Sequence, residues 1–299
     1  MPVRLLTTLV ALLVSISLVS PTWADSFTFT AIPDQNASRL QQRFGQVAAY
    51  LQEQLGVEVT YIPVKSYAAA VTAFRNNQVQ LGWFGALSGV QARQRVPGSR
   101  AIAQGYEDQF FKTYFIAHRS SGLLDGMGDG NDKKNKQFPL AIANHTFTFG
   151  AKGSTSGRLM PEYYIRQHLG KAPSESFRRV GFSGDHNRTI ALVGSGAYEV
   201  GAVNYKVWEK ALAAKKVDPQ QVQVIWQTPP YPDYQWSIRG DVDQRWGEGF
   251  SDKVKAALLA INQPELLAAF PRSAFISAAN SDYEPTRKTA VAIGLIDER

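Results

Sequence analysis

The chain passes from a strand into a helix along Thr148-Phe149-Gly150-Ala151-Lys152-Gly153-Ser154-Thr155-Ser156-Gly157-Arg158-Leu159-Met160. Glycines at 150, 153 and 157 let the backbone turn tightly and approach a ligand closely. Three consecutive hydroxyl residues then occupy the first turn of the helix, where unpaired N–H groups and the helix dipole favour an anion. One such residue would be explained as an ordinary helix cap. Three in a row between glycines favour an anion-binding turn.

The same run does not match the enzyme motifs that it superficially suggests. A nucleophile elbow needs serine at its centre, where Gly153–Gly157 has Thr155. A P-loop needs lysine after the glycine, whereas Lys152 precedes Gly153. The absence of cysteine excludes disulfides, Cys-ligated metals and thiol nucleophiles, and the four histidines have no metal-ligand spacing. We therefore expect a binding protein rather than an enzyme, with no cofactor and no metal.

Strand and helix patterns alternate on both sides of this run, which predicts an α/β fold. The ranges before it are strands 26–32, 57–64 and 80–84 with helices 36–55 and 67–75, then a strand at 111–118 and a polar loop at 120–137. The ranges from it onward are strands 146–150, 178–182, 200–203 and 223–227 with helices 155–169 and 187–194, then helices 252–262, 265–269 and 285–293.

Two α/β units joined by crossings near 115–120 and 224–232 predict two lobes that face each other across a cleft. The second crossing continues into the stiff run Thr228-Pro229-Pro230-Tyr231-Pro232-Asp233. We assign residues 25–117 and 227–299 to lobe 1 and residues 118–226 to lobe 2. A length of 299 residues with 44% hydrophobic side chains suits two domains of this kind.

The first 24 residues have the pattern of a secretory signal peptide. Arg4 is followed by an apolar run from Leu5 to Val19, then by Pro21 and by small residues before Ala24. A membrane anchor is the alternative, but the run is short for a bilayer. We expect cleavage after Ala24 and a soluble periplasmic protein without a lipid anchor. The net charge of +7 suits an anionic ligand, and the dispersed basic residues argue against nucleic-acid binding.

Other candidate residues are ambiguous when taken singly. His186, in Gly184-Asp185-His186, is a donor to an oxyanion or a surface residue at a helix cap. Tyr67 follows the helix cap Ser66 and suits either the site or the core. Trp83 and Phe84 end a strand, so they line the cleft or fill the core.

Together these pieces resemble the periplasmic solute-binding proteins of ABC importers for phosphonate, phosphite and phosphate. The resemblance covers the chain after residue 24 and rests on the order and spacing of several runs: Val64-Lys65-Ser66-Tyr67-Ala68-Ala69-Ala70-Val71, Gln80-Leu81-Gly82-Trp83-Phe84-Gly85, Gly153–Gly157, Gly184-Asp185-His186 and Gly201-Ala202-Val203-Asn204. It implies a type II two-lobe binding fold, each lobe a mixed sheet flanked by helices, joined by two hinge crossings. It further implies a monomer that delivers a small oxyanion to a membrane permease and its ATPase.

By this resemblance, Tyr67 and the Ser154-Thr155-Ser156 turn hold the oxyanion, His186 closes over it and Asp233 receives a ligand proton. The remaining ligand-binding candidates are Trp83, Phe84, Phe111, Asn204 and Tyr205.

Two departures bear on the ligand. Tyr205-Lys206 stands where relatives that bind aminoalkylphosphonates carry a carboxylate, and Phe111 lacks the hydroxyl often found at its position. A selenate-binding branch of the superfamily is also similar, as is an enzyme class on the same two-lobe fold. A carboxylate in the cleft, Asp233 or Asp185, favours a protonated phosphorus oxyanion. Hydroxyls, His186 and Lys206 alone would favour a sulfate-like anion.

Overall fold

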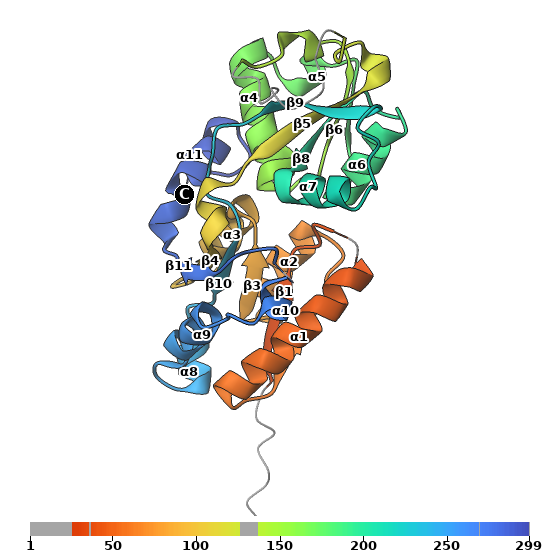
Figure 1. Cartoon of the computed structure of the whole chain (residues 1–299). Coiled ribbons are helices and arrows are strands. Elements are labelled where there is room, and N and C mark those ends of the chain that lie inside the picture. Colours follow the sequence, from red (N-terminus) through yellow and green to blue (C-terminus); the bar gives the residue numbers. More distant parts are fainter. Residues whose placement is uncertain (1–25, 36, 126–136, 269, 299) are drawn as a thin grey trace, which may run out of the picture.

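The computed structural model describes residues 26–35, 37–125, 137–268 and 270–298, and their strands form two sheets (Figure 1). The first sheet has the order β11 (Phe275–Ser277), β4 (Arg100–Gly105), β10 (Gln235–Ile238), β3 (Leu81–Phe84), β1 (Phe27–Ala31) and β2 (Val59–Tyr61). The second has the order β7 (Arg179–Phe182), β6 (Thr146–Phe149), β8 (Val200–Asn204), β5 (Thr113–His118) and β9 (Val222–Gln227). We call each sheet with its helices a lobe.

Both sheets are mixed. In the first lobe β1 pairs in parallel with β2 and β3, whereas β10 is antiparallel to β3 and β4. In the second lobe β6 is parallel to β7 and β8, whereas β5 is antiparallel to β8 and β9. The predicted fold class, two mixed sheets flanked by helices, is therefore confirmed.

Helices cover the sheets of both lobes (Figure 1). Those of the first lobe are α1 (Ala37–Leu55), α2 (Tyr67–Arg75), α3 (Ala86–Gln94), α8 (Val242–Trp246), α9 (Phe250–Leu259), α10 (Pro264–Leu267) and α11 (Glu284–Ala292). Those of the second are α4 (Met160–Leu169), α5 (Pro173–Ser176), α6 (His186–Gly194) and α7 (Tyr205–Ala213). Across the described ranges, each helix is too short or too polar to traverse a bilayer.

Consecutive residues of β3 pack on opposite faces of the first sheet, as the two-residue repeat of a strand requires. The Trp83 ring lies 5.4 Å from Trp236 and 5.1 Å from Phe270, on the face that α1 also covers. The Phe84 ring lies 5.6 Å from Phe74 of α2, on the other face. The two side chains therefore belong to different parts of the core, and the strand ends where the lobes meet.

The two crossings pair with each other. Phe111 and Tyr231 exchange backbone hydrogen bonds of 2.9 and 3.0 Å, and β5 begins two residues after Phe111. The first crossing therefore lies before residue 113, earlier than the predicted 115–120, because β5 already pairs with strands of the second sheet. The boundary drawn at residue 117 placed most of β5 in lobe 1. The boundary drawn before residue 227 likewise placed the last residue of β9 in lobe 1. The rest of the division into lobes stays a prediction.

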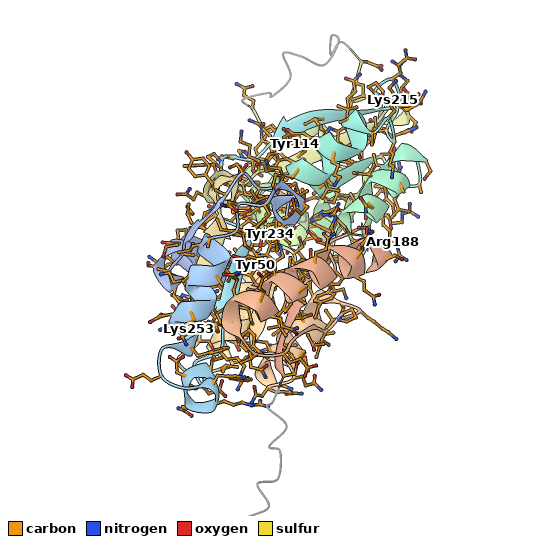
Figure 2. The ribbon with its side chains drawn as sticks, turned by 60° about the horizontal axis from the view of Figure 1, so that its bottom comes forward. Tyr50, Tyr114, Arg188, Lys215, Tyr234 and Lys253 are labelled. Carbon is orange, nitrogen blue, oxygen red and sulfur yellow. The ribbon has the colours of Figure 1, made fainter. Side chains whose placement is uncertain are left out.

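Basic side chains are spread over the surface. Arg188 and Lys215 of the second lobe and Lys253 of the first lie at separate places (Figure 2), and all three are exposed. The predicted signal peptide and most of the polar loop at 120–137 lie outside the described residues.

Candidate functional site

The turn after β6 is built by two glycines and one serine. The Gly150 N–H donates to the Gly157 carbonyl at 2.7 Å, and a Cβ on either glycine would come within about 3.1 Å of the other's Cα. Ser154 Oγ accepts a hydrogen bond from the Gly157 N–H at 2.9 Å, so this hydroxyl is a helix cap. The following turn, Thr155–Leu159, is π-helical, and it leads directly into α4.

The hydroxyls of this turn face other candidate residues in a buried place. Ser154, Thr155 and Ser156 are each at most 2% exposed. Ser154 shares a side-chain hydrogen bond with Tyr67, which begins α2 in the first lobe, and the Gly153 backbone packs against the same tyrosine. The turn of the second lobe therefore meets the first lobe through the residues that the sequence singled out.

Thr155 and Asp233 satisfy the first N–H groups of α3, which a helix leaves without intrahelical partners. Thr155 Oγ1 accepts from the Leu87 N–H at 3.1 Å, and Asp233 Oδ1 accepts from the Ala86 N–H at 2.9 Å. The two side chains also share a hydrogen bond. A Cβ at Gly85 would lie 3.1 Å from Asp233 Oδ1 and 3.2 Å from Thr155 Oγ1, so glycine permits this close meeting.

Burial governs the charge of two carboxyl groups at the junction of the lobes. Desolvation raises the pKa of Asp233 to about 7, against the lowering effect of the hydrogen bonds from Ala86 and Thr155. Desolvation likewise raises the pKa of Asp34 to about 6, although Tyr234 donates a hydrogen bond to it. Asp233 can therefore carry or accept a proton near neutral pH.

These raised pKa values predict how stability depends on pH without ligand. Because both carboxyls bind protons more tightly in the folded state, their stabilising contribution is complete below about pH 4 and is lost as pH rises through 6 to 7. We expect Asp233→Asn to gain about 2 kcal/mol over the parent between pH 5 and pH 8, since one pKa unit is worth about 1.4 kcal/mol. Thermal unfolding of both proteins in anion-free buffers measures this difference. If acidification stabilises Asp233→Asn relative to the parent, the prediction is contradicted.

His186 begins α6 and is fully buried. Its Nδ1 accepts from the Asn204 N–H at 3.3 Å, which leaves Nε2 to carry the proton, 3.4 Å from Ser156 Oγ. Desolvation lowers the pKa of His186 to about 3, so the ring is a neutral donor at pH 7. The helix cap is Asp185, whose carboxylate accepts from the Arg188 N–H at 2.9 Å. The structure therefore excludes the interpretation of His186 as a surface residue at a helix cap.

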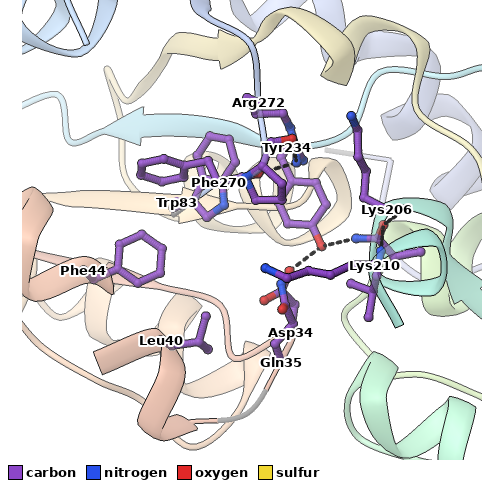
Figure 3. A pocket seen from close by; sticks show the side chains of 13 residues that line it. Asp34, Gln35, Leu40, Phe44, Trp83, Lys206, Lys210, Tyr234, Phe270 and Arg272 are labelled. Carbon is purple, nitrogen blue, oxygen red and sulfur yellow. Dashed lines mark hydrogen bonds between the residues drawn. The ribbon is translucent and has the colours of Figure 1, made fainter. Parts of the chain in front are cut away.

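The aromatic candidates lie around this centre. Phe111 is fully buried at the crossing, with its ring 4.9 Å from Tyr205 and 5.3 Å from Tyr234. Trp83 stacks on Tyr234 at 5.5 Å and lines a small cavity with it (Figure 3). Phe84 lies in the core beneath α2, which is the core alternative of the two considered for this residue.

Asn204 and Lys206 have partners within the protein. Asn204 Oδ1 accepts from the N–H groups of Lys206 and Val207 at 2.8 and 3.3 Å and so caps α7. The Lys206 ammonium lies 3.7 Å from Glu107 Oε1 of the first lobe. Lys206, which departs from the carboxylate expected in relatives that bind aminoalkylphosphonates, therefore forms an ion pair between the lobes.

A buried ion pair packs against the two crossings between the lobes. Arg272 donates to both oxygens of Asp108 at 2.6 and 2.7 Å, and both side chains are at most 3% exposed. The Asp108 carbonyl accepts from the Asp233 N–H at 3.0 Å, and the Arg272 guanidinium lies over the rings of Phe111 and Tyr234. This pair therefore holds Asp233 in place.

Sequence reasoning missed four residues of this region: Asp34, Tyr231, Tyr234 and Arg272. Asp34 follows β1, at the edge where parallel strands end and ligands usually bind, so its position was a usable signal. Tyr231 and Tyr234 flank Asp233 in the crossing. Arg272 had no local signal, because its partner Asp108 lies 164 residues away.

A family model and a sequence relative show the family of this chain. Residues 29–283 match the family model described as ABC transporter, phosphonate, periplasmic substrate-binding protein. The chain is 41% identical over 259 residues to the probable ABC transporter phosphite binding protein PhnD1 of Prochlorococcus marinus, covering 85% of each chain. The structure of PhnD1 from that organism in complex with methylphosphonate matches with a TM-score of 0.82 and 39% identity, over 91% of this chain and 99% of the other.

A binding protein component of a Pseudomonas aeruginosa ABC phosphonate transporter matches with a TM-score of 0.74 and 21% identity, over 89% of this chain and 86% of the other. At this identity the match concerns the fold.

Proposed function

Because the chain belongs to the family of periplasmic substrate-binding proteins of phosphonate ABC transporters, we propose that it captures a small phosphorus oxyanion between its lobes. The family consists of binding proteins, so the prediction of binding rather than catalysis is confirmed. The ligands in the names of its relatives, phosphite and methylphosphonate, are the ones we propose here.

One observation carries this proposal: neutral donors converge with the buried Asp233 carboxyl where the lobes meet. The donors are the side chains of Tyr67, Thr155, Ser156 and His186 and the first N–H groups of α3. Neutral donors suit a monoanion. They stabilise its single negative charge through hydrogen bonds and bring no positive charge that a second negative charge would have to balance. Asp233 then accepts the hydrogen bond of a P–OH group, which phosphite and methylphosphonate offer near neutral pH.

In this arrangement the ligand replaces contacts that the protein makes with itself. An oxyanion oxygen takes the hydrogen bonds of the α3 N–H groups, which now go to Asp233 and Thr155. A second oxygen accepts from His186 Nε2–H and Ser156 Oγ–H. The bound anion thus connects α3 of the first lobe to α6 and the hydroxyl turn of the second.

Selenate or another sulfate-like anion is the alternative ligand. The buried position of Asp233 disfavours it, since an aprotic dianion meets a buried carboxylate without a shared proton. An aminoalkylphosphonate is also disfavoured, because Lys206 would repel its ammonium group. We further propose delivery to a membrane permease and its ATPase, a monomeric state, and export by the signal sequence of residues 1–24.

Isothermal titration calorimetry with phosphite, methylphosphonate, phosphate, sulfate and selenate tests the proposed function. We expect phosphite or methylphosphonate to bind most tightly and to remain chemically unchanged after incubation. Tighter binding of selenate than of phosphite or methylphosphonate would identify the alternative ligand, a sulfate-like anion, as the one that the protein captures. Binding of none of these anions would contradict the proposal.

A further inference from the structure

Three buried side chains form a hydrogen-bonded chain between the lobes. The Tyr234 hydroxyl donates to Asp34 Oδ2 at 2.7 Å and accepts from Asn204 Nδ2 at 3.1 Å (Figure 3). Asp34 follows β1 of the first lobe, whereas Asn204 ends β8 of the second. The three residues are 7%, 2% and 3% exposed. We call Asp34, Tyr234 and Asn204 the interlobe latch.

A second set of bonds ties the latch to the site. The Asp34 carbonyl accepts from the His186 N–H at 3.2 Å, and His186 Nδ1 accepts from the Asn204 N–H at 3.3 Å. His186 is thus held on one side by Asp34 and on the other by Asn204. Any separation of the lobes must break the bonds from Asp34 and Tyr234 to the second lobe, because their partners lie there.

The latch groups direct their hydrogen bonds to one another and to α7. The Tyr234 hydroxyl uses its one proton on Asp34 and accepts from Asn204, while Asn204 Oδ1 already caps α7. The Tyr234 ring is fixed between Trp83 at 5.5 Å and Phe111 at 5.3 Å. A cavity of about 20 Å³ beside these residues leaves little room for rearrangement.

From this geometry we infer that the interlobe latch holds the lobes closed and positions His186 without contacting the ligand. The inference rests on the proposed function, since it assigns these residues to retention of the anion bound there. A latch that exists only in the closed state slows release of the ligand and leaves its entry nearly unchanged. The expected effect therefore falls on koff.

Tyr234→Phe tests the latch, because it removes the hydroxyl and keeps the ring. We expect koff for methylphosphonate, measured by stopped flow, to rise about ten-fold, the equivalent of one buried hydrogen bond or slightly more. The association rate constant should change less than about two-fold. By small-angle scattering, the ligand-saturated variant should have a larger radius of gyration than the ligand-saturated parent.

Tyr50→Phe is the matched control. Tyr50 lies in the first lobe (Figure 2). Its hydroxyl donates to the Ala257 carbonyl of the same lobe at 2.8 Å, in a buried contact. We expect this variant to lose stability while koff and the radius of gyration stay at parental values. Equal effects of the two variants on koff would overturn the latch.

Asp34→Asn keeps an acceptor for Tyr234 and serves if Tyr234→Phe fails to fold. We expect koff to rise less than for Asp34→Ala, and the effects of Asp34→Ala and Tyr234→Phe to be non-additive in the double variant. Parental koff in Asp34→Ala would overturn the latch. Absence of binding by the parent would instead refute the proposed function, so the two failures are distinguishable.

Discussion

Thr155→Val should weaken the binding of phosphite or methylphosphonate by about 10- to 100-fold. The substitution keeps the shape of the side chain and removes the hydroxyl that we propose to donate to the anion. Without ligand, this hydroxyl bonds to Asp233 and accepts from the Leu87 N–H. A lost hydrogen bond to a charged group costs about 1.5–3 kcal/mol. The bond from the Leu87 N–H is lost only from the ligand-free state, because the anion is proposed to take that N–H on binding. Calorimetric titration measures the change.

Thr30→Val is the matched control for this prediction. Thr30 is also fully buried, and its hydroxyl donates to the Ile62 carbonyl at 2.6 Å within the first lobe. We expect the control to lose stability and to keep its affinity. If Thr155→Val binds as tightly as the parent, the hydroxyl serves only the junction between α3 and the turn.

The elements predicted correctly are those whose apolar residues recur with one clear period. Helix α1 (Ala37–Leu55) was predicted within a residue because its apolar residues follow helical spacing and Gly56 ends it. Helix α3 (Ala86–Gln94) was missed because its first five residues are all buried and its less buried polar residues lie only in its second half, so no polar face runs along its length. Strand β10 (Gln235–Ile238) was missed because four residues are too few to establish an alternation.

Within the candidate site, the residues that were predicted also have a local sequence signal, and most of the residues that were missed do not. The Ser154-Thr155-Ser156 turn and His186 were found because the glycines and helix starts beside them are local in sequence. The interlobe latch was not found, because Asp34 and Tyr234 are 200 residues apart and each resembles an ordinary buried residue. Sequence patterns report which groups begin a helix. They do not report which groups meet when two lobes close.

Ligand choice should depend most strongly on Asp233. In the parent we expect phosphite to bind about ten-fold more tightly than sulfate or selenate at pH 7, because its P–OH group, still present at this pH, shares a proton with the buried carboxylate. Asp233→Asn offers an uncharged amide that accepts from the Ala86 N–H and also donates to an oxyanion. The variant should therefore lose most of the preference, mainly by binding the aprotic anions more tightly.

The pH dependence of this preference follows from the proton that Asp233 and the ligand must share. Because burial raises the pKa of Asp233 to about 7, acidification from pH 8 to pH 6 protonates this carboxyl and lets it donate to sulfate. Sulfate affinity of the parent should therefore rise on acidification, whereas that of Asp233→Asn should stay flat. Phosphite brings its own proton, so its affinity should change little from pH 6 to 7 and fall above that range as the free ligand loses the proton. Calorimetry from pH 5 to 9 measures all three curves. Selenate binding more tightly than phosphite, and more tightly still in Asp233→Ala, would make the ligand a sulfate-like anion and leave the fold unaffected.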